Sequence, residues 1–230
     1  MSNESITIVF DPAGNRQELA PALAQGGEGV VFPLKSRTDV LVKCYHPEVL
    51  RKRALSLDAK VRVMVDMKEQ FRGSLCWPSV RVFDQAGNWR GYAMRRANGV
   101  SMFKLAHAML YQKHFPGLDR RHVASYLLDL LSRIEMLHAR GVMVGDYNLQ
   151  NLLCVPGTSV VELIDCDSYQ VRTGGQLFRC PVGSPDMTAP EQQNQSFDRI
   201  DRTLESERFS VAIVLFKCLM LGRHPYDMVG

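Results

Sequence analysis

The hydrophobic pattern of the chain changes near residue 97, and this change constrains the fold more than any other feature. Before it, apolar and β-branched residues form short runs typical of strands, at 6–10, 30–32, 40–43, 80–83 and 92–94. After Gly99, apolar residues recur at steps of three and four, which is the spacing of a helix face. The sequence therefore predicts an α+β protein with a small β-rich part followed by a mostly helical part.

One helix interrupts the strands of the first part. Between about 47 and 70, Leu50, Ala54, Leu57 and Val61 recur on one helical face. The runs 80–83 and 92–94 flank a turn-forming segment and predict a hairpin.

The second part predicts three helices and one hairpin. We expect a short helix at 101–111, a long one at 119–140 that ends at Gly141, and a buried one at 211–221. Apolar runs at 152–155 and 161–164 flank a Pro-Gly-Thr turn and predict the hairpin. Residues 166–206 are rich in Pro, Gly, Asp and Ser, and we expect an irregular segment there, of the kind that usually serves a function.

Composition limits the classes of partner and the compartment. A net charge of +4, spread along the chain, is too small to predict nucleic-acid binding. The six cysteines show no C-x-x-C pair and predict reduced, mostly buried thiols. The N-terminus lacks a secretory pattern, and the run 211–221 is too short to span a bilayer, so we expect no membrane segment in this chain and a cytoplasmic location. Nothing in the sequence predicts an oligomeric state.

A glycine cluster and a strand lysine are candidates for phosphate binding. Gly26, Gly27 and Gly29 lie between two predicted strands, where bare backbone could bring its N–H groups close to a phosphate. A tight hairpin turn would use the same residues. Lys43 ends a strand and could neutralise phosphate charge, although a lysine there is also compatible with a surface position.

Three polar residues near the second hairpin are candidates for metal binding and proton transfer. Asn151 precedes the hairpin and Asp165 follows it, so the open end of the hairpin would bring an amide oxygen and a carboxylate oxygen together. Mg²⁺ prefers oxygen ligands of these kinds. Asp146 lies nearby and could accept a proton from an attacking hydroxyl.

The order of these motifs, followed by Ala189-Pro190-Glu191, resembles a protein kinase over about residues 23–225. Among kinases the chain is most similar to divergent bacterial Ser/Thr protein kinases of the YegI-like kind. The resemblance implies a bilobal fold with an N-lobe at 1–97, a hinge at 95–99 and a C-lobe at 98–230, in which the final helices of the large lobe are expected to be absent. It also implies ATP and Mg²⁺ as cofactors and proteins bearing Ser or Thr as substrates.

The resemblance assigns a role to each matching residue. It implies that Asp146 is the catalytic base, that Ser184 supports it, and that Asn151 and Asp165 bind the metal. It further implies that Lys43 holds the α- and β-phosphates. The residues that would contact ATP are Gly26, Gly27, Gly29, Val31, Lys43, Met94, Arg95 and Ala97. The acid expected to pair with Lys43 is Asp58, because Glu48 and Glu69 lie too near the ends of the predicted helix.

Several positions depart from the kinase pattern. Val144-Gly145 replaces His-Arg, so the arginine that normally meets a phosphate on the activation segment is missing, and we expect no requirement for that phosphate. Asn148 replaces a lysine near the transferred phosphate and predicts slow catalysis. Asp167 replaces the glycine of Asp-Phe-Gly, which hinders a peptide flip or else brings an oxygen to a second metal. Glu207 replaces an Asp that bonds the catalytic-loop backbone.

Three functions remain compatible with these residues. The first is an active Ser/Thr protein kinase, because the base, both metal ligands and the lysine are all present. The second is a pseudokinase or nucleotide-binding scaffold, to which the departures point. Transfer to a small molecule is disfavoured by the match at 183–191, which is typical of protein kinases.

Overall fold

A computed structural model describes residues 6–71, 73 and 75–227 of the chain. Residues 1–5 of the N-terminus, where the sequence lacks a secretory pattern, lie outside this range. The described chain divides into two compact units, residues 1–96 and 97–230, each with its own packing. The expected α+β class is confirmed, since strands dominate the first unit and the long helices other than α1 belong to the second.

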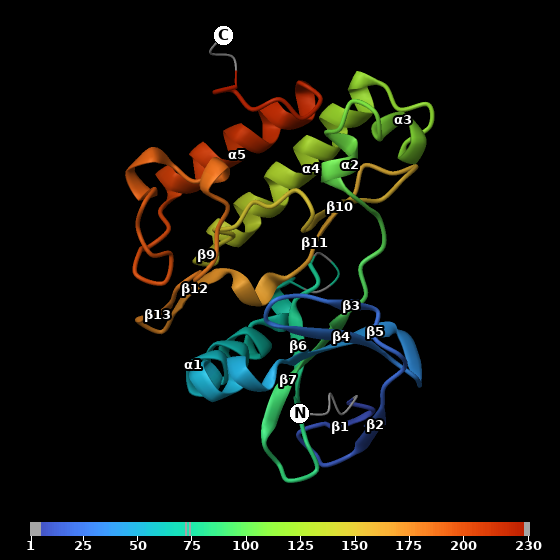
Figure 1. The fold of residues 1–230 in the computed structure, drawn as a ribbon, viewed down its shortest axis with the longest axis vertical. Coiled ribbons are helices and arrows are strands. Elements are labelled where there is room, and N and C mark those ends of the chain that lie inside the picture. The colour runs from blue at the N-terminus through green and yellow to red at the C-terminus, as the bar shows by residue number, and fades with distance from the viewer. Residues whose placement is uncertain (1–5, 72, 74, 228–230) are drawn as a thin grey trace. The chain divides into compact units, whose positions relative to one another are not determined.

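The first unit is a seven-stranded antiparallel sheet with the order β2-β1-β6-β7-β5-β4-β3. Its strands are β1 (Ile8–Phe10), β2 (Arg16–Glu18), β3 (Ala24–Gln25), β4 (Gly29–Leu34), β5 (Arg37–Tyr45), β6 (Pro78–Phe83) and β7 (Trp89–Arg95). The expected hairpin is β6–β7. Helix α1 (Pro47–Asp66) packs against β6 and β7, and the short 3₁₀ helix η1 (Lys68–Phe71) follows it (Figure 1).

Alternation along the strands divides the side chains of this sheet between two faces. One face holds a core cluster that includes Phe32, Val42, Cys44 and Ala93, all at most 9% exposed. Successive residues of a strand point to opposite faces, so the residues between these lie on the other face. That other face is the one against which α1 packs, because Arg81 of β6 bonds Asp58 of α1.

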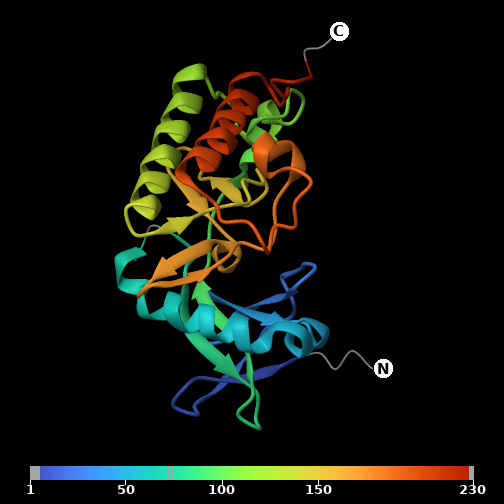
Figure 2. The same ribbon diagram turned by 90° about the vertical axis from the view of Figure 1, so that its left-hand side faces the viewer.

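The second unit contains two long helices that lie side by side, α4 (Arg120–His138) and α5 (Leu204–Leu219) (Figure 2). The start of α4 follows directly from the sequence, because the Asp119 carboxylate accepts hydrogen bonds from the N–H groups of Arg121 and His122. Its apolar face, including Leu127, Leu130 and Ile134, is buried as the spacing predicted.

Two three-stranded sheets complete the second unit. One joins β8 (Val100–Ser101) to the predicted hairpin, which is formed by β10 (Leu152–Cys154) and β11 (Val161–Leu163). The other joins β9 (Val142–Met143), β12 (Gln170–Thr173) and β13 (Gln176–Phe178). Short 3₁₀ helices lie at η2 (Cys166–Ser168), η3 (Pro185–Met187) and η4 (Pro190–Gln192).

Three expected elements of this unit are corrected. The helix expected at 101–111 is two single turns, α2 (Met102–Leu105) and α3 (Tyr111–His114), separated by a turn in which the His107 ring accepts the N–H of Met109. Part of the segment expected to be irregular is the β12–β13 hairpin, whose turn residues Gly174 and Gly175 both have positive φ. The last helix begins at 204 rather than 211, because Thr203 and Ser206 form a capping box.

Candidate active site

Three of the residues expected to contact ATP, Val31, Lys43 and Met94, share one face of the sheet of the first unit. Val31 of β4 lies opposite Lys43 of β5, and Lys43 in turn lies opposite Tyr92 of β7. Residues paired in this way share a face, and Met94 joins them two positions beyond Tyr92. Lys43 is 7% exposed, and its ammonium lies 5.5 Å from the centre of the Tyr45 ring.

The glycine cluster forms the turn of the β3–β4 hairpin. The N–H of Gly26 donates to the carbonyl of Gly29, and the side chain of Glu28 in the turn is held by Arg53. Gly29 is required for packing, since a Cβ there would lie 2.4 Å from the carbonyl oxygen of Cys44. A Cβ at Gly27 would meet no atom within 4 Å. The hairpin interpretation is therefore correct, and the open backbone at Gly26 and Gly27 remains available for a ligand.

The expected pairing of Asp58 with Lys43 is corrected by the structure. Both carboxylate oxygens of Asp58 accept hydrogen bonds from Arg81, at 2.7 and 2.8 Å, and Arg62 lies 3.5 Å away on the next turn of the helix. A planar guanidinium matches a carboxylate with two parallel bonds, which a lysine cannot form. Asp58 therefore ties α1 to β6.

The buried charged residue of α1 is a lysine that sequence reasoning did not single out. Lys60 is 4% exposed and shares the buried face of α1 with Leu57, Val61 and Met64. Asp58 follows Leu57 in the chain and lies off that buried face. The helical spacing of the apolar residues already contained this signal, because 57, 60, 61 and 64 fall on one stripe.

The end of β7 leads to the expected hinge. Met94 is 7% exposed and lies opposite Leu41, while Arg95 is the last residue of the strand and pairs with Val40. The N–H of Arg96 donates to the carbonyl of Asp39, which extends the pairing by one residue. The division between the units follows immediately, with Ala97 as the first residue of the second unit.

The loop at residues 144–147, which the resemblance assigns as the catalytic loop, is built around Glu207, which is 1% exposed. Its carboxylate accepts the N–H groups of Val144 and Gly145, at 3.0 and 2.8 Å. The phenol of Tyr147 donates to the same group, and a ring nitrogen of His138 lies 3.1 Å from it. Burial, reinforced by the charge of Glu207, raises the pKa of the Tyr147 phenol well above its usual value, so Tyr147 stays a donor.

The structure brings Asp146 and Ser184 together. The Ser184 hydroxyl donates to Oδ1 of Asp146 at 3.0 Å, across 38 positions of sequence. Burial raises the pKa of the Asp146 carboxyl above its usual value, although the Ser184 hydrogen bond and the charge of Arg202 oppose this shift. Asp146 is thus a half-buried carboxylate with one oriented oxygen, as a general base requires.

Asn151 and Asp165 meet at the open end of the β10–β11 hairpin. The register pairs Leu152 with Leu163, and the N–H of Ile164 donates to the carbonyl of Asn151 at 3.0 Å. Asp165, one residue further, has φ of 58°, a conformation that costs energy in a residue with a Cβ and is concentrated at functional sites. One amide oxygen and one carboxylate fit the ligand preference of Mg²⁺.

Comparison with known proteins decides the family. No family model matches the chain. Protein kinase YegI of Escherichia coli (strain K12) is 30% identical to it over 226 residues, which cover 96% of this chain and 34% of YegI. Probable serine/threonine-protein kinase WNK8 of Oryza sativa subsp. japonica is 23% identical over 212 residues, covering 85% of this chain and 31% of that protein. The chain belongs to the protein kinase superfamily and is YegI-like. It spans about a third of the length of these relatives.

The structure explains why this kinase-superfamily chain has glycine where the resemblance implies arginine. Gly145 has φ of 73°, and a Cβ there would lie 2.7 Å from the sulfur of Cys180 and 3.4 Å from the side chain of Arg202. No side chain fits this position without moving Cys180. The absence of an arginine at position 145 is therefore coupled to the packing of Cys180 against Gly145.

The other departures are accommodated locally. The side-chain oxygen of Asn148 accepts the N–H of Gln150, and its carbonyl accepts the N–H of Asn151, so it shapes the turn between Asp146 and Asn151. Asp167 lies in η2 and is only 2% exposed. The segment that follows Asp165 therefore carries a buried carboxylate at this position.

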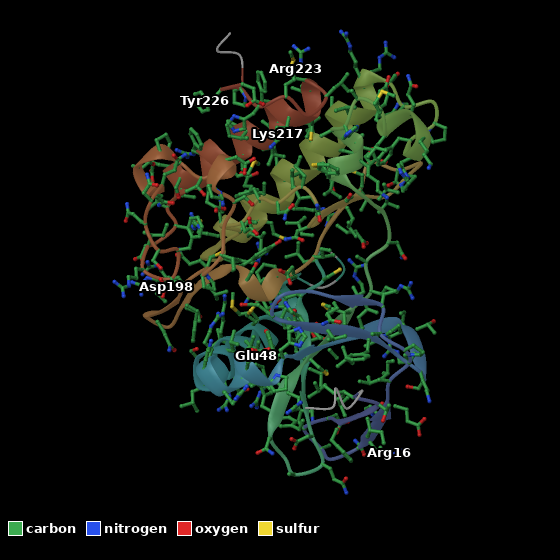
Figure 3. The ribbon with its side chains drawn as sticks, viewed as in Figure 1. Arg16, Glu48, Asp198, Lys217, Arg223 and Tyr226 are labelled. Carbon is green, nitrogen blue, oxygen red and sulfur yellow. The ribbon has the colours of Figure 1, made fainter. Side chains whose placement is uncertain are left out.

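A cavity of about 570 Å³ lies beside Ser184 in the second unit. Its lining includes Asn148, Asp186 and Lys217, and the Lys217 ammonium lies 2.9 Å from the Asp186 carboxylate. Lys217 and Arg223, labelled in Figure 3, add positive charge to the wall. The cavity thus places polar and charged groups next to the hydroxyl that orients Asp146.

Two other kinds of feature, a metal-binding cluster and a membrane-spanning helix, are absent from the described residues. No group of three or more His, Cys, Asp or Glu side chains among them is placed to hold a metal ion. No helix in the part of the chain that the structure describes combines the length and the apolar character needed to cross a bilayer. None of the six cysteines, all of which the structure describes, forms a disulfide, and all are buried, as the sequence predicted.

Proposed function

We propose that the chain transfers the terminal phosphoryl group of ATP to Ser or Thr hydroxyls of protein substrates, without needing phosphate on its own activation segment. The observation that carries this proposal is the 3.0 Å hydrogen bond from Ser184 to Asp146. It leaves the second carboxylate oxygen of Asp146 to accept the proton of an incoming hydroxyl.

The remaining groups divide the work of binding. Asn151 and Asp165 would hold Mg²⁺, which neutralises phosphate charge when bound, and Lys43 would pair with the α- and β-phosphates. Gly26, Gly27, Gly29 and Val31 would cover the phosphates, and the adenine would meet Met94 and the backbone of Arg95 and Ala97. Since Asn148 brings no positive charge, we expect a low turnover number.

A protein substrate is favoured over a small molecule by the cavity beside Ser184. Its size and its mixed lining suit a side chain next to the reacting hydroxyl. Asp186 and Lys217 would bond polar groups of that neighbouring residue. Six free, buried thiols suit a reducing compartment, which supports a cytoplasmic location.

A second candidate function is that of a nucleotide-binding module with little transfer. The observation that favours it is the set of departures at Gly145, Asn148 and Asp167, which together remove two cations and add one buried carboxylate. We favour the active enzyme because loss of the base or of a metal ligand normally abolishes transfer, and none of these is lost.

The test compares the unmodified chain with Asp146→Asn, using radiolabelled Mg-ATP and a generic basic protein. We expect Asp146→Asn to lose on the order of 10³-fold in rate, as removal of a general base typically does. Asp84→Asn is the matched control, because Asp84 only caps the exposed β6–β7 turn. Equal incorporation by the unmodified chain and Asp146→Asn would contradict the proposal.

A further inference from the structure

Arg202 is a buried cation that no motif predicted. It is 5% exposed and lies two residues before α5. Among the residues that the structure describes, no carboxylate lies within ion-pair distance of it. A buried charge without an ion-pair partner is costly, so a side chain of this kind needs compensating contacts.

The guanidinium of Arg202 instead holds two points of residues 180–193, the segment that contains the residues assigned by resemblance to the end of the activation segment. One nitrogen donates to the side-chain oxygen of Gln192 at 3.1 Å, and another donates to the carbonyl of Val182 at 3.1 Å. Its carbon lies 4.8 Å from the centre of the Phe197 ring, a cation–π contact. Val182 is two residues from Ser184, so these hydrogen bonds of Arg202 lie close to the hydroxyl that bonds Asp146.

The backbone of Arg202 is fixed by two glutamines. Gln170 of β12, which is 2% exposed, accepts the N–H of Arg202 at 2.8 Å and donates to its carbonyl at 2.9 Å. Gln192 donates to the carbonyl of Asp201 at 3.1 Å while its oxygen accepts from the guanidinium. Arg202 is thus held at both ends by side chains that carry no net charge.

Two glycines give Arg202 its place beside the catalytic loop. A Cβ at Gly183 would lie 2.8 Å from a guanidinium nitrogen, and one at Gly145 would lie 3.4 Å from the Arg202 side chain. The charge of Arg202 also lowers the pKa of Asp146, against the larger effect of burial. The Arg202 side chain therefore lies beside Gly145 of the catalytic loop, the position at which the family pattern has an arginine.

We infer that Arg202 is a positioning residue that permanently takes over the work of a phosphate-dependent switch. It holds residues 180–193 against the catalytic loop through Val182 and Gln192, and it returns a positive charge to the neighbourhood of Asp146. This inference rests on the proposed kinase function for its catalytic part. The holding of the segment is a property of the fold and can be measured without activity.

The experiment compares Arg202→Gln, Arg202→Lys and the control Arg199→Gln in the full chain. Arg199 is three residues away and exposed. We expect Arg202→Gln to lower kcat by about 30-fold while the KM for Mg-ATP changes by less than about twofold, because only positioning is lost. Arg202→Lys should recover about half of that loss on a logarithmic scale, and Arg199→Gln should match the unmodified chain.

Hydrogen exchange of residues 180–193 supplies the second measurement. We expect these amides to exchange about tenfold faster in Arg202→Gln than in Arg199→Gln, because local opening becomes easier. Unchanged exchange in Arg202→Gln would overturn the inference, as would kcat values equal to those of the control. An inactive unmodified chain with faster exchange in Arg202→Gln would defeat the proposed function and still support the holding role.

A second variant guards against a failure to fold. If circular dichroism shows that Arg202→Gln is unfolded, Gln192→Met replaces it, because this change removes one acceptor of the guanidinium and keeps the cation. The expected result is exchange of residues 180–193 about threefold faster than in the control. Exchange equal to that of the control would contradict the inference.

Discussion

The catalytic loop and the glycine turn reach defined conformations through different sets of interactions. Residues 144–147 are held by hydrogen bonds that converge on the buried carboxylate of Glu207. Gly26 and Gly27 of the glycine turn are exposed, the N–H of Gly26 bonds the carbonyl of Gly29, and Gly29 must lack a side chain because Cys44 lies against it. The first loop depends on a buried carboxylate whose donors must all be present, whereas the glycine turn also depends on the space beside Gly29 staying empty.

This difference teaches which substitutions each loop can bear. A hydrogen-bonded loop tolerates a change of length in its central acid if all donors remain satisfied, which is how Glu207 can serve where the family has Asp. A turn defined by space tolerates new chemistry only where its backbone is open, as at Gly27. The first three predictions below test this contrast, beginning with the largest effect.

Glu207→Gln should break the catalytic loop. The amide nitrogen can only donate, so it would face donors from the backbone, Tyr147 or His138 and leave at least one of them unsatisfied. We expect a loss of about 3 kcal/mol in the free energy of unfolding, measured by urea denaturation. Glu205→Gln, an exposed change on the same turn of α5, is the control and should stay within about 0.5 kcal/mol.

Gly29→Ala should disturb the β4–β5 pairing through steric overlap. With Cβ placed 2.4 Å from the Cys44 carbonyl oxygen, the strands must separate, and we expect a cost of about 2 kcal/mol. Gly27→Ala meets no atom within 4 Å and should change the free energy of unfolding by less than about 0.5 kcal/mol.

The same pair of variants tests the phosphate-binding role of the turn. If Gly27 approaches a phosphate, Gly27→Ala should reduce the thermal shift produced by Mg-ATP while its unfolding without ligand stays normal. An unreduced shift would remove Gly27 from the binding site. It would leave the structural account of Gly29 in place.

The pH dependence of transfer should follow the environment of Asp146. A base works only when ionised, and burial raises the pKa of Asp146, so activity should fall as pH decreases through that raised value. Ser184→Ala removes a hydrogen bond that lowers this pKa and should move the acidic limb of kcat/KM to higher pH. Asp186→Asn removes a negative charge that raises it and should move the limb to lower pH. Shifts in the same direction for both variants would contradict this account.

Periodicity and turn chemistry predicted much of the fold. Helix α4 and the hairpins β6–β7 and β10–β11 lie where the pattern indicated, because each combines a regular apolar face with an explicit cap or turn. The start of α5 could not be read from apolar spacing, since its first two turns bury Ser206, Glu207 and Ser210 through hydrogen bonds. The β12–β13 hairpin was missed although Gly174-Gly175 was a turn signal.

The site was predicted less evenly. The motif order correctly indicated that Ser184 would meet Asp146 and that Glu207 would bond the loop backbone. The predicted pairing of Asp58 was wrong because position along the helix does not fix the face, and Asp58 lies beside the buried stripe that contains Lys60 and bonds Arg81. Arg202 could not be found from the sequence, because its partners are neutral and far apart along the chain.

The six buried thiols can report how fast each unit of the chain opens. Burial raises the pKa of both Cys44 and Cys218 to about 12, so almost no thiolate forms at neutral pH while the fold is closed. Cys44 and Cys76 belong to the first unit, and the other four belong to the second. The rate at which an alkylating reagent modifies each set of cysteines therefore measures the opening of each unit separately, without any introduced label.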